Sequence, residues 1–218
     1  MRRTAPAPGG ERAGRTRPDG GPRVLYFGTY DRSIGRNAVV LEALAAAGIE
    51  VTECHARLWR DTADKLRAVR SNPLGTAMRQ AAAWLRLLDA YRAAGPYDAM
   101  IVGATAHLDL PLARLLATAA GRPLVFDPLV SALETVRDRR LVSDPGRLRA
   151  LGALERLLLG LPDRIWLDTA AHADALEREV GLARSRVAVV PAGAPREYRA
   201  LAVPYDARRA SVRRPLRV

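Results

Sequence analysis

The chain has 218 residues, 49% of them hydrophobic, and a formal net charge of +12. It is long enough to bury one sizeable core, which excludes disorder throughout. Its one cysteine, Cys54, excludes a disulfide framework and a cysteine-rich zinc site. This favours a reducing, cytoplasmic setting. Much of the charge lies at the ends: five arginines against two acids over residues 1–22, and seven against two over residues 196–218. Nucleic acid is therefore not expected as a partner.

Composition divides the chain into three parts. Residues 1–22 are rich in Arg, Pro and Gly, lack the apolar core of a signal peptide, and predict a disordered leader. Residues 23–195 alternate short apolar runs with longer Ala- and Leu-rich segments of helical period. Residues 196–218 predict an Arg-rich tail. No apolar run reaches the roughly 20 nearly uncharged residues that a membrane span requires.

The middle part predicts an α/β fold, a single Rossmann-like doubly wound domain with a mainly parallel sheet. The expected strands are 24–28, 50–54, 99–103, 123–127, 164–168 and 187–190. The expected helices are 36–47, 74–94, 110–120, 145–160 and 170–180, and residues 55–73 fit no period. Expected helix N-caps are Asp109, Asp144 and Thr169, and expected helix ends are Gly48, Gly95, Gly121 and Gly181.

A polar loop, residues 28–37, follows the first strand and opens a helix. Ligands of open α/β sheets bind beyond the carboxyl ends of the strands, and a helix start offers unpaired N–H donors to an anion. Gly28 and Gly35 are seven residues apart, so the loop is not a G-x-G-x-x-G sequence, and it is not a Walker A loop either. A standard dinucleotide site is not expected, and a polar turn without a ligand explains the same residues.

Single polar residues follow three other strands. His107 has the chemistry to hydrogen-bond a sugar hydroxyl or a phosphate, and a packed histidine at a helix start is an equal alternative. Asp127 and Asp168 end neighbouring strands, where they either hold substrate hydroxyls and act in acid–base chemistry or serve as turn and cap residues. The same capping alternative applies to Asp109 and Thr169. No metal-ligand spacing and no Ser-His-Asp set is found.

One helical segment, residues 78–92, has an amphipathic pattern. Its apolar face is expected to contain Trp84, Leu85, Leu88 and Tyr91, with Arg79, Arg86 and Arg92 around it. Such a helix either lies on an anionic membrane surface or, more often, covers a sheet.

Five ordered segments carry a resemblance to a known family. They are RVLYFGTYDRSIGRNAVVLEALAAAGIEVTECHARLW at 23–59, HLDLPLARLLA at 107–117, RPLVFDPLVSALET at 122–135, DRIWLDTAAHADAL at 163–176 and VAVVPAGA at 187–194. Together they span the expected folded part, and in order and spacing they resemble the opening domain of family 4 glycosyltransferases.

The resemblance implies one half of a GT-B architecture, in which two Rossmann-like domains face each other. The chain is similar to the N-terminal, acceptor-side domain, and the C-terminal domain that holds the nucleotide sugar is missing, whether lost by truncation or a frame change or supplied by another chain. The implied reaction is hexosyl transfer from a nucleotide sugar to an acceptor hydroxyl, without a cofactor and without an obligatory metal. Residues 190–193 would form the exit toward the second domain.

By resemblance, the catalytic candidates are His107 and Asp127. The acceptor-binding candidates are Gly28, Thr29, Tyr30, Arg36, Asn37, Asp109, Asp168 and Thr169. Implied partners are a donor-binding domain or chain, an acceptor glycan or glycolipid, and peripheral contact with the inner membrane face. One alternative is a non-catalytic glycan-binding or partner module that reuses the fold. Another is an unrelated Rossmann-like enzyme such as a nucleotide-sugar epimerase, against which the absent G-x-G-x-x-G sequence argues.

Overall fold

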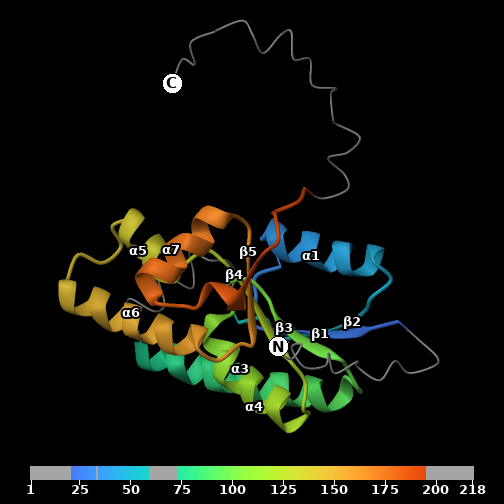
Figure 1. Cartoon of the computed structure of the whole chain (residues 1–218). Coiled ribbons are helices and arrows are strands. Elements are labelled where there is room, and N and C mark those ends of the chain that lie inside the picture. The colour runs from blue at the N-terminus through green and yellow to red at the C-terminus, as the bar shows by residue number, and fades with distance from the viewer. Residues whose placement is uncertain (1–20, 33, 59–72, 195–218) are drawn as a thin grey trace, which may run out of the picture.

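Six parallel strands form one sheet in the computed structural model, which describes residues 21–32, 34–58 and 73–194 (Figure 1). The sheet order is β2-β1-β3-β4-β5-β6. The strands are β1 (Arg23–Gly28), β2 (Glu50–His55), β3 (Ala99–Val102), β4 (Leu124–Leu129), β5 (Arg164–Leu167) and β6 (Val187–Val189). The expected α/β, Rossmann-like doubly wound fold is confirmed.

All five expected helices are present. The helices are α1 (Gly35–Ala46), α3 (Pro73–Ala93), α4 (Leu110–Ala119), α5 (Ala132–Asp138), α6 (Pro145–Leu159) and α7 (Ala170–Val180), with 3₁₀ turns at His107–Asp109 and Arg184–Arg186. Helix α5 was not expected. Residues 1–20, 59–72 and 195–218 lie outside the described residues, so nearly all of the expected leader, most of the segment without a period, and the tail are not tested.

The connections place helices on both faces of the sheet. The chain moves outward from β1 to β2 and then reverses across β1 to β3. Because βαβ crossovers are right-handed, this reversal puts α1 and α3 on opposite faces. Figure 1 shows α1 on one side of the strands, and α3 and α4 on the other. The direction in which successive strands are added to the sheet therefore changes between β1 and β3, and open α/β sheets form their ligand crevice at such a point.

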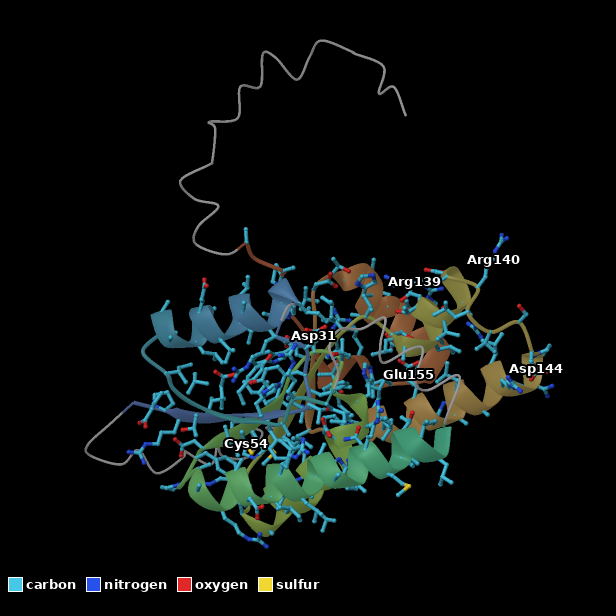
Figure 2. The ribbon with its side chains drawn as sticks, turned by 180° about the vertical axis from the view of Figure 1, so that it is seen from behind. Asp31, Cys54, Arg139, Arg140, Asp144 and Glu155 are labelled. Carbon is cyan, nitrogen blue, oxygen red and sulfur yellow. The ribbon has the colours of Figure 1, made fainter. Side chains whose placement is uncertain are left out.

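The core lies in the central strands, which are apolar on both faces as parallel strands require. Leu25, Tyr26 and Phe27 of β1 are all fully buried. Cys54 of β2 is also buried, and its Sγ donates to the carbonyl of Leu87 on α3 at 3.3 Å (Figure 2). Burial raises the pKa of the Cys54 thiol to about 12, so this thiol stays protonated and packs as an apolar group.

The buried and exposed sides of helix α3 differ from the expected amphipathic pattern. Trp84 and Tyr91 are half-buried toward the core, but Leu85 lies on the opposite side and is 65% exposed. The buried side of the helix includes the polar Gln80. The expected apolar face is therefore wrong at Leu85. No helix among the described residues is both long and apolar enough to cross a membrane.

Local capping signals in the sequence are confirmed at two helix starts. The carboxylate of Asp144 accepts a hydrogen bond from the backbone N–H of Arg147 at 2.6 Å and caps α6. The hydroxyl of Thr169 accepts from the N–H of His172 at 3.2 Å and caps α7. Helix α7 ends at Gly181 in the left-handed conformation, as expected.

Close packing at the end of β3 leads to the first prediction. A Cβ at Gly103 would lie 2.8 Å from ring atoms of both Tyr26 and Tyr30. Both rings are buried, so they have little room to move. We expect Gly103→Ala to lower the free energy of unfolding by about 1–3 kcal/mol, measured by urea denaturation.

The matched control is Gly35→Ala at the start of α1, where a Cβ would meet nothing within 4 Å. We expect this variant to be neutral or slightly more stable, because alanine favours a helix. Equal destabilisation by the two variants would contradict the assigned packing around Gly103.

Candidate functional site at the carboxyl edge of the sheet

The carboxyl ends of the strands bring most of the expected site residues to one edge. Strands β1 and β3 end at Gly28 and Val102, and Asp168 directly follows β5. Strand β4 continues to Leu129, so Asp127 lies within the strand rather than at its end; the register shifts between Phe126 and Leu129. All the strands are parallel, so these positions share one edge.

Asp109 is the hydrogen-bonding centre of this edge. It is fully buried, and Oδ2 accepts from both the backbone N–H and the hydroxyl of Thr29, at 2.6 and 2.7 Å. Oδ1 accepts from Gln80 Nε2 at 2.5 Å and from Trp84 Nε1 at 3.0 Å. Asp109 stands at the N-cap position of α4, but its side chain makes no capping bond there. The expected cap is corrected: the carboxylate joins the loop after β1 to helix α3 instead.

The position of the Asp109 carboxylate requires a glycine at residue 28. Its φ of +128° lies in a region that side chains rarely adopt. A Cβ there would also lie 3.0 Å from the Cβ of Ala106 and 3.1 Å from Oδ2 of Asp109. The glycine therefore lets the start of the loop pass directly over the Asp109 carboxylate.

Arg36 and Asp127 form a buried ion pair. The side chains are 2% and 0% exposed, and Nε of Arg36 lies 2.8 and 3.2 Å from the two carboxylate oxygens. Nη1 donates to the carbonyl of Val190 at 2.7 Å. Nη2 is buried without a hydrogen bond in the part of the chain that the structure describes. One guanidinium thus joins α1, β4 and the segment after β6.

The ionisation of Asp127 is set by opposing effects. Burial raises the pKa of the Asp127 carboxyl, and the nearby carboxylate of Asp168 adds to this, whereas the guanidinium of Arg36 lowers it. The burial effect is the largest, so the net pKa is raised. A carboxylate in this position depends on Arg36 to remain charged.

Asn37 links the two loops beside the reversal in strand order. Its Oδ1 accepts from the hydroxyl of Tyr26 and from the N–H of Ala104, both at 2.8 Å. Its Nδ2 donates to the carbonyl of Asp31 at 2.7 Å. The side chain is 1% exposed. These bonds fix the loop after β1 against the loop after β3.

Tyr30 belongs to a separate cluster at the end of β2. Its buried hydroxyl donates to the carboxylate of Glu53, which also pairs with Arg32 at 3.0 Å. His55 packs its ring against Tyr30, with centroids 4.5 Å apart, and its Nε2 lies 3.0 Å from the Tyr30 carbonyl oxygen. Burial raises the pKa of Tyr30 above its ordinary value and lowers that of His55.

The remaining expected residues are more accessible. His107 is half-buried and contacts Phe126 edge to face, with ring centroids 4.9 Å apart. Asp168 accepts a hydrogen bond from Nδ1 of His172 at 2.6 Å. Thr169 is exposed apart from its capping role. Sequence reasoning did not identify His172, although an Asp and a His four residues apart at a helix start are a usable signal.

Glu155 is another residue that the sequence analysis missed. It is buried on α6, and it accepts hydrogen bonds from Ser131 Oγ, Ala132 N and Leu133 N at 2.7–3.0 Å (Figure 2). It thereby fixes the start of α5. The S-x-x-E pattern from Ser131 to Glu134 is a capping box that indicates the start of α5, but nothing local in the sequence points to Glu155 as its partner.

Among the described residues, no group of three or more His, Cys, Asp or Glu side chains forms a candidate metal site. A comparison with models of known protein families found no match, and neither did a search of curated proteins.

The role of Asp109 is testable by one atom's change. In Asp109→Asn an amide NH₂ would face groups that are themselves donors. We expect the free energy of unfolding to fall by about 2–4 kcal/mol, measured by urea denaturation. Asp89→Asn on the outside of α3 should change it by less than about 0.5 kcal/mol, since Asp89 and its partner Arg92 are exposed. Similar losses in both variants would show that the Asp109 bonds contribute little.

Proposed function

We propose that this chain binds the acceptor in a hexosyl transfer reaction, as the acceptor-side domain of a family 4-like glycosyltransferase. The observation that supports the proposal best is the gathering of polar loops at one sheet edge around the reversal between β1 and β3. Open α/β sheets use this edge for ligands. The donor, a nucleotide sugar, is held by a separate donor-binding domain or chain.

The chemistry of this edge supports acceptor binding by this chain and donor binding by a separate domain or chain. Carboxylates and amides suit hydrogen bonds to sugar hydroxyls. The half-buried Asp168 lies in the accessible part, whereas Nε2 of the half-buried His107 is buried. The leaving nucleoside diphosphate needs several positive charges or N–H donors. Among the residues that the structure describes, Arg36 is the one buried arginine, and it is already paired with Asp127. The groups that stabilise the leaving group therefore come from the donor-binding side.

A non-catalytic glycan-binding module is the second candidate. It is favoured by the complete burial of Asp109 and Asp127, whose oxygens bond within the protein. Buried carboxylates with internal partners hold a scaffold rather than react. Both candidates bind a glycan, and they differ in whether a nucleotide sugar is consumed.

Saturation-transfer NMR on the full chain tests the proposal. The probes are octyl glycosides of several hexoses as acceptors, and a panel of nucleotide sugars and nucleoside diphosphates. We expect saturation of one or more glycosides and weak or no saturation of the nucleotides, because the buried guanidinium of Arg36 is already paired with Asp127. Free octanol is the control for binding through the alkyl chain.

The outcomes separate the candidates. Glycoside saturation supports both, and sugar transfer on addition of a donor-binding partner distinguishes the enzyme from the binding module. Strong nucleotide-sugar saturation without glycoside saturation would contradict an acceptor-side role. Absence of any saturation would contradict both candidates.

Peripheral membrane contact is the second part of the proposal, and helix α3 is the surface that supports it. Three large apolar side chains on its outer side are 65–73% exposed, and we name them the α3 outer stripe: Leu74, Met78 and Leu85. Arg79 and Arg86 are exposed beside the stripe. Apolar groups flanked by arginines complement an anionic lipid surface. A lipid-linked acceptor would be available at that surface.

Co-sedimentation with vesicles tests this contact. We expect binding to phosphatidylcholine vesicles that contain phosphatidylglycerol and much weaker binding to pure phosphatidylcholine. Leu85→Glu should weaken binding about tenfold or more, since it replaces an inserted apolar group with a repelled charge. Ala43→Glu on α1, across the sheet, adds the same charge and should have little effect. Equal effects of the two variants would contradict docking through α3.

A further inference from the structure

A cluster of polar side chains stands at the end of β2, next to the loop after β1. The register of the two strands pairs His55, the last residue of β2, with Gly28, where the loop begins. Side chains alternate along a strand, so Glu53 and His55 point to one face of the sheet and Cys54 to the other, toward α3. Glu53 and His55 therefore lie on the side of the sheet that carries α1, at the edge where the strand order changes direction.

The hydrogen bond of His55 determines which nitrogen of its ring carries the proton. Nε2 lies 3.0 Å from the carbonyl oxygen of Tyr30, and a carbonyl oxygen only accepts hydrogen bonds. In the neutral ring the proton is therefore on Nε2, and the lone pair is on Nδ1. The Tyr30 ring packs against that of His55, with centroids 4.5 Å apart, and this contact limits rotation of the imidazole.

Nδ1 of His55 is available to a ligand. It makes no hydrogen bond to any residue that the structure describes, and it is not one of the buried polar atoms that lack a partner. Because the ring is only half-buried, Nδ1 reaches solvent. It offers a hydrogen-bond acceptor of fixed orientation at the carboxyl edge of the sheet.

The ring of His55 is neutral at neutral pH. Burial has the largest effect on the pKa of His55 and lowers it. The bond to the Tyr30 carbonyl raises this pKa, the charge of Arg32 lowers it, and the carboxylates of Glu53 and Asp109 raise it. The net pKa is lowered, so Nδ1 keeps its lone pair at neutral pH.

Arg32 adds a charged donor to the cluster. Its Nη2 lies 3.0 Å from Oε2 of Glu53, which also accepts the hydroxyl of Tyr30. The Arg32 side chain is 59% exposed, so other N–H groups of its guanidinium are open to solvent. An acceptor lone pair and a charged N–H donor suit two neighbouring hydroxyl groups, because each hydroxyl is able to donate and to accept. A hexose carries such pairs of hydroxyls around its ring.

We infer that this cluster recognises the acceptor hexose: one hydroxyl donates a hydrogen bond to Nδ1 of His55, and a neighbouring hydroxyl accepts one from Arg32. The inference rests on the proposed function and deepens it, because it names groups that hold the acceptor sugar. Both residues bind the sugar and transfer no proton. The bond to Tyr30 positions the imidazole beside the loop after β1.

Titration of the histidine rings by NMR in the full chain tests the inference, with an octyl glycoside that shows saturation transfer as the probe. The chain has three histidines, and single substitutions assign their signals. We expect the neutral ring of His55 to carry its proton on Nε2. Saturation with the glycoside should lower the measured pKa of His55, because a sugar hydroxyl and a proton compete for Nδ1. The glycoside should accordingly bind about tenfold more weakly once the pH has fallen below that pKa.

Variants add an independent measure. His55→Phe should weaken glycoside binding about tenfold and remove this dependence on pH. Arg32→Met should weaken binding about threefold to tenfold. Its matched control is Arg23→Met, which removes an arginine paired with Glu50 at the same 3.0 Å, at the opposite end of β1 and β2. The control variant should bind the glycoside as the unaltered chain does.

The titration uses the unaltered protein, so it does not depend on whether a variant folds. Glycoside binding that leaves the pKa of His55 unchanged, or a neutral ring with its proton on Nδ1, would overturn the inference while the proposed acceptor site stands. Equal weakening by Arg32→Met and Arg23→Met would contradict the role of Arg32. Absence of binding by every glycoside would refute the proposed function, and this inference with it.

Discussion

The buried pair of Arg36 and Asp127 is the constraint on which the carboxyl edge depends. Both charges have left water, and neither is stable there without the other. The same guanidinium also bonds to the carbonyl of Val190, so α1, β4 and the exit from β6 must all be in place before the pair is complete. Formation of the edge is therefore coupled to formation of the whole sheet rather than to any single loop.

The second buried carboxylate, Asp109, holds loops in place, so only a few other residues of this edge are able to contact a ligand. Asp109 accepts hydrogen bonds from Thr29 and Trp84, and Asn37 accepts one from Tyr26. These two side chains fix the loops and do not face solvent. This gives the loops after β1 and β3 a rigid shape. Half-exposed groups such as Asp168 then stand on a prearranged support, which limits the entropy lost when a ligand binds.

The sequence predicted the strands and the helices that depend on local signals, because apolar runs and caps such as Asp144 and Thr169 act over a few residues. Helix α5 was missed although its capping box is visible, since only seven residues follow it in the helix. The partners of Asp109 were out of reach, because Gln80 is 29 positions away and only the fold brings it near. The exposed position of Leu85 on α3 was missed because the buried side of this helix includes the polar residues Thr76 and Gln80.

The carbonyl of Val190 has a mechanical consequence. Strand β6 has three residues and, among the residues that the structure describes, pairs with β5 alone, so few backbone hydrogen bonds hold this edge strand. Immediately beyond it, Val190 bonds to Leu167 through its N–H and to Arg36 through its carbonyl. Tension applied at Val190 would act on its hydrogen bond to Arg36 before it separates β6 from β5, so Arg36 protects the last strand from being pulled off the sheet.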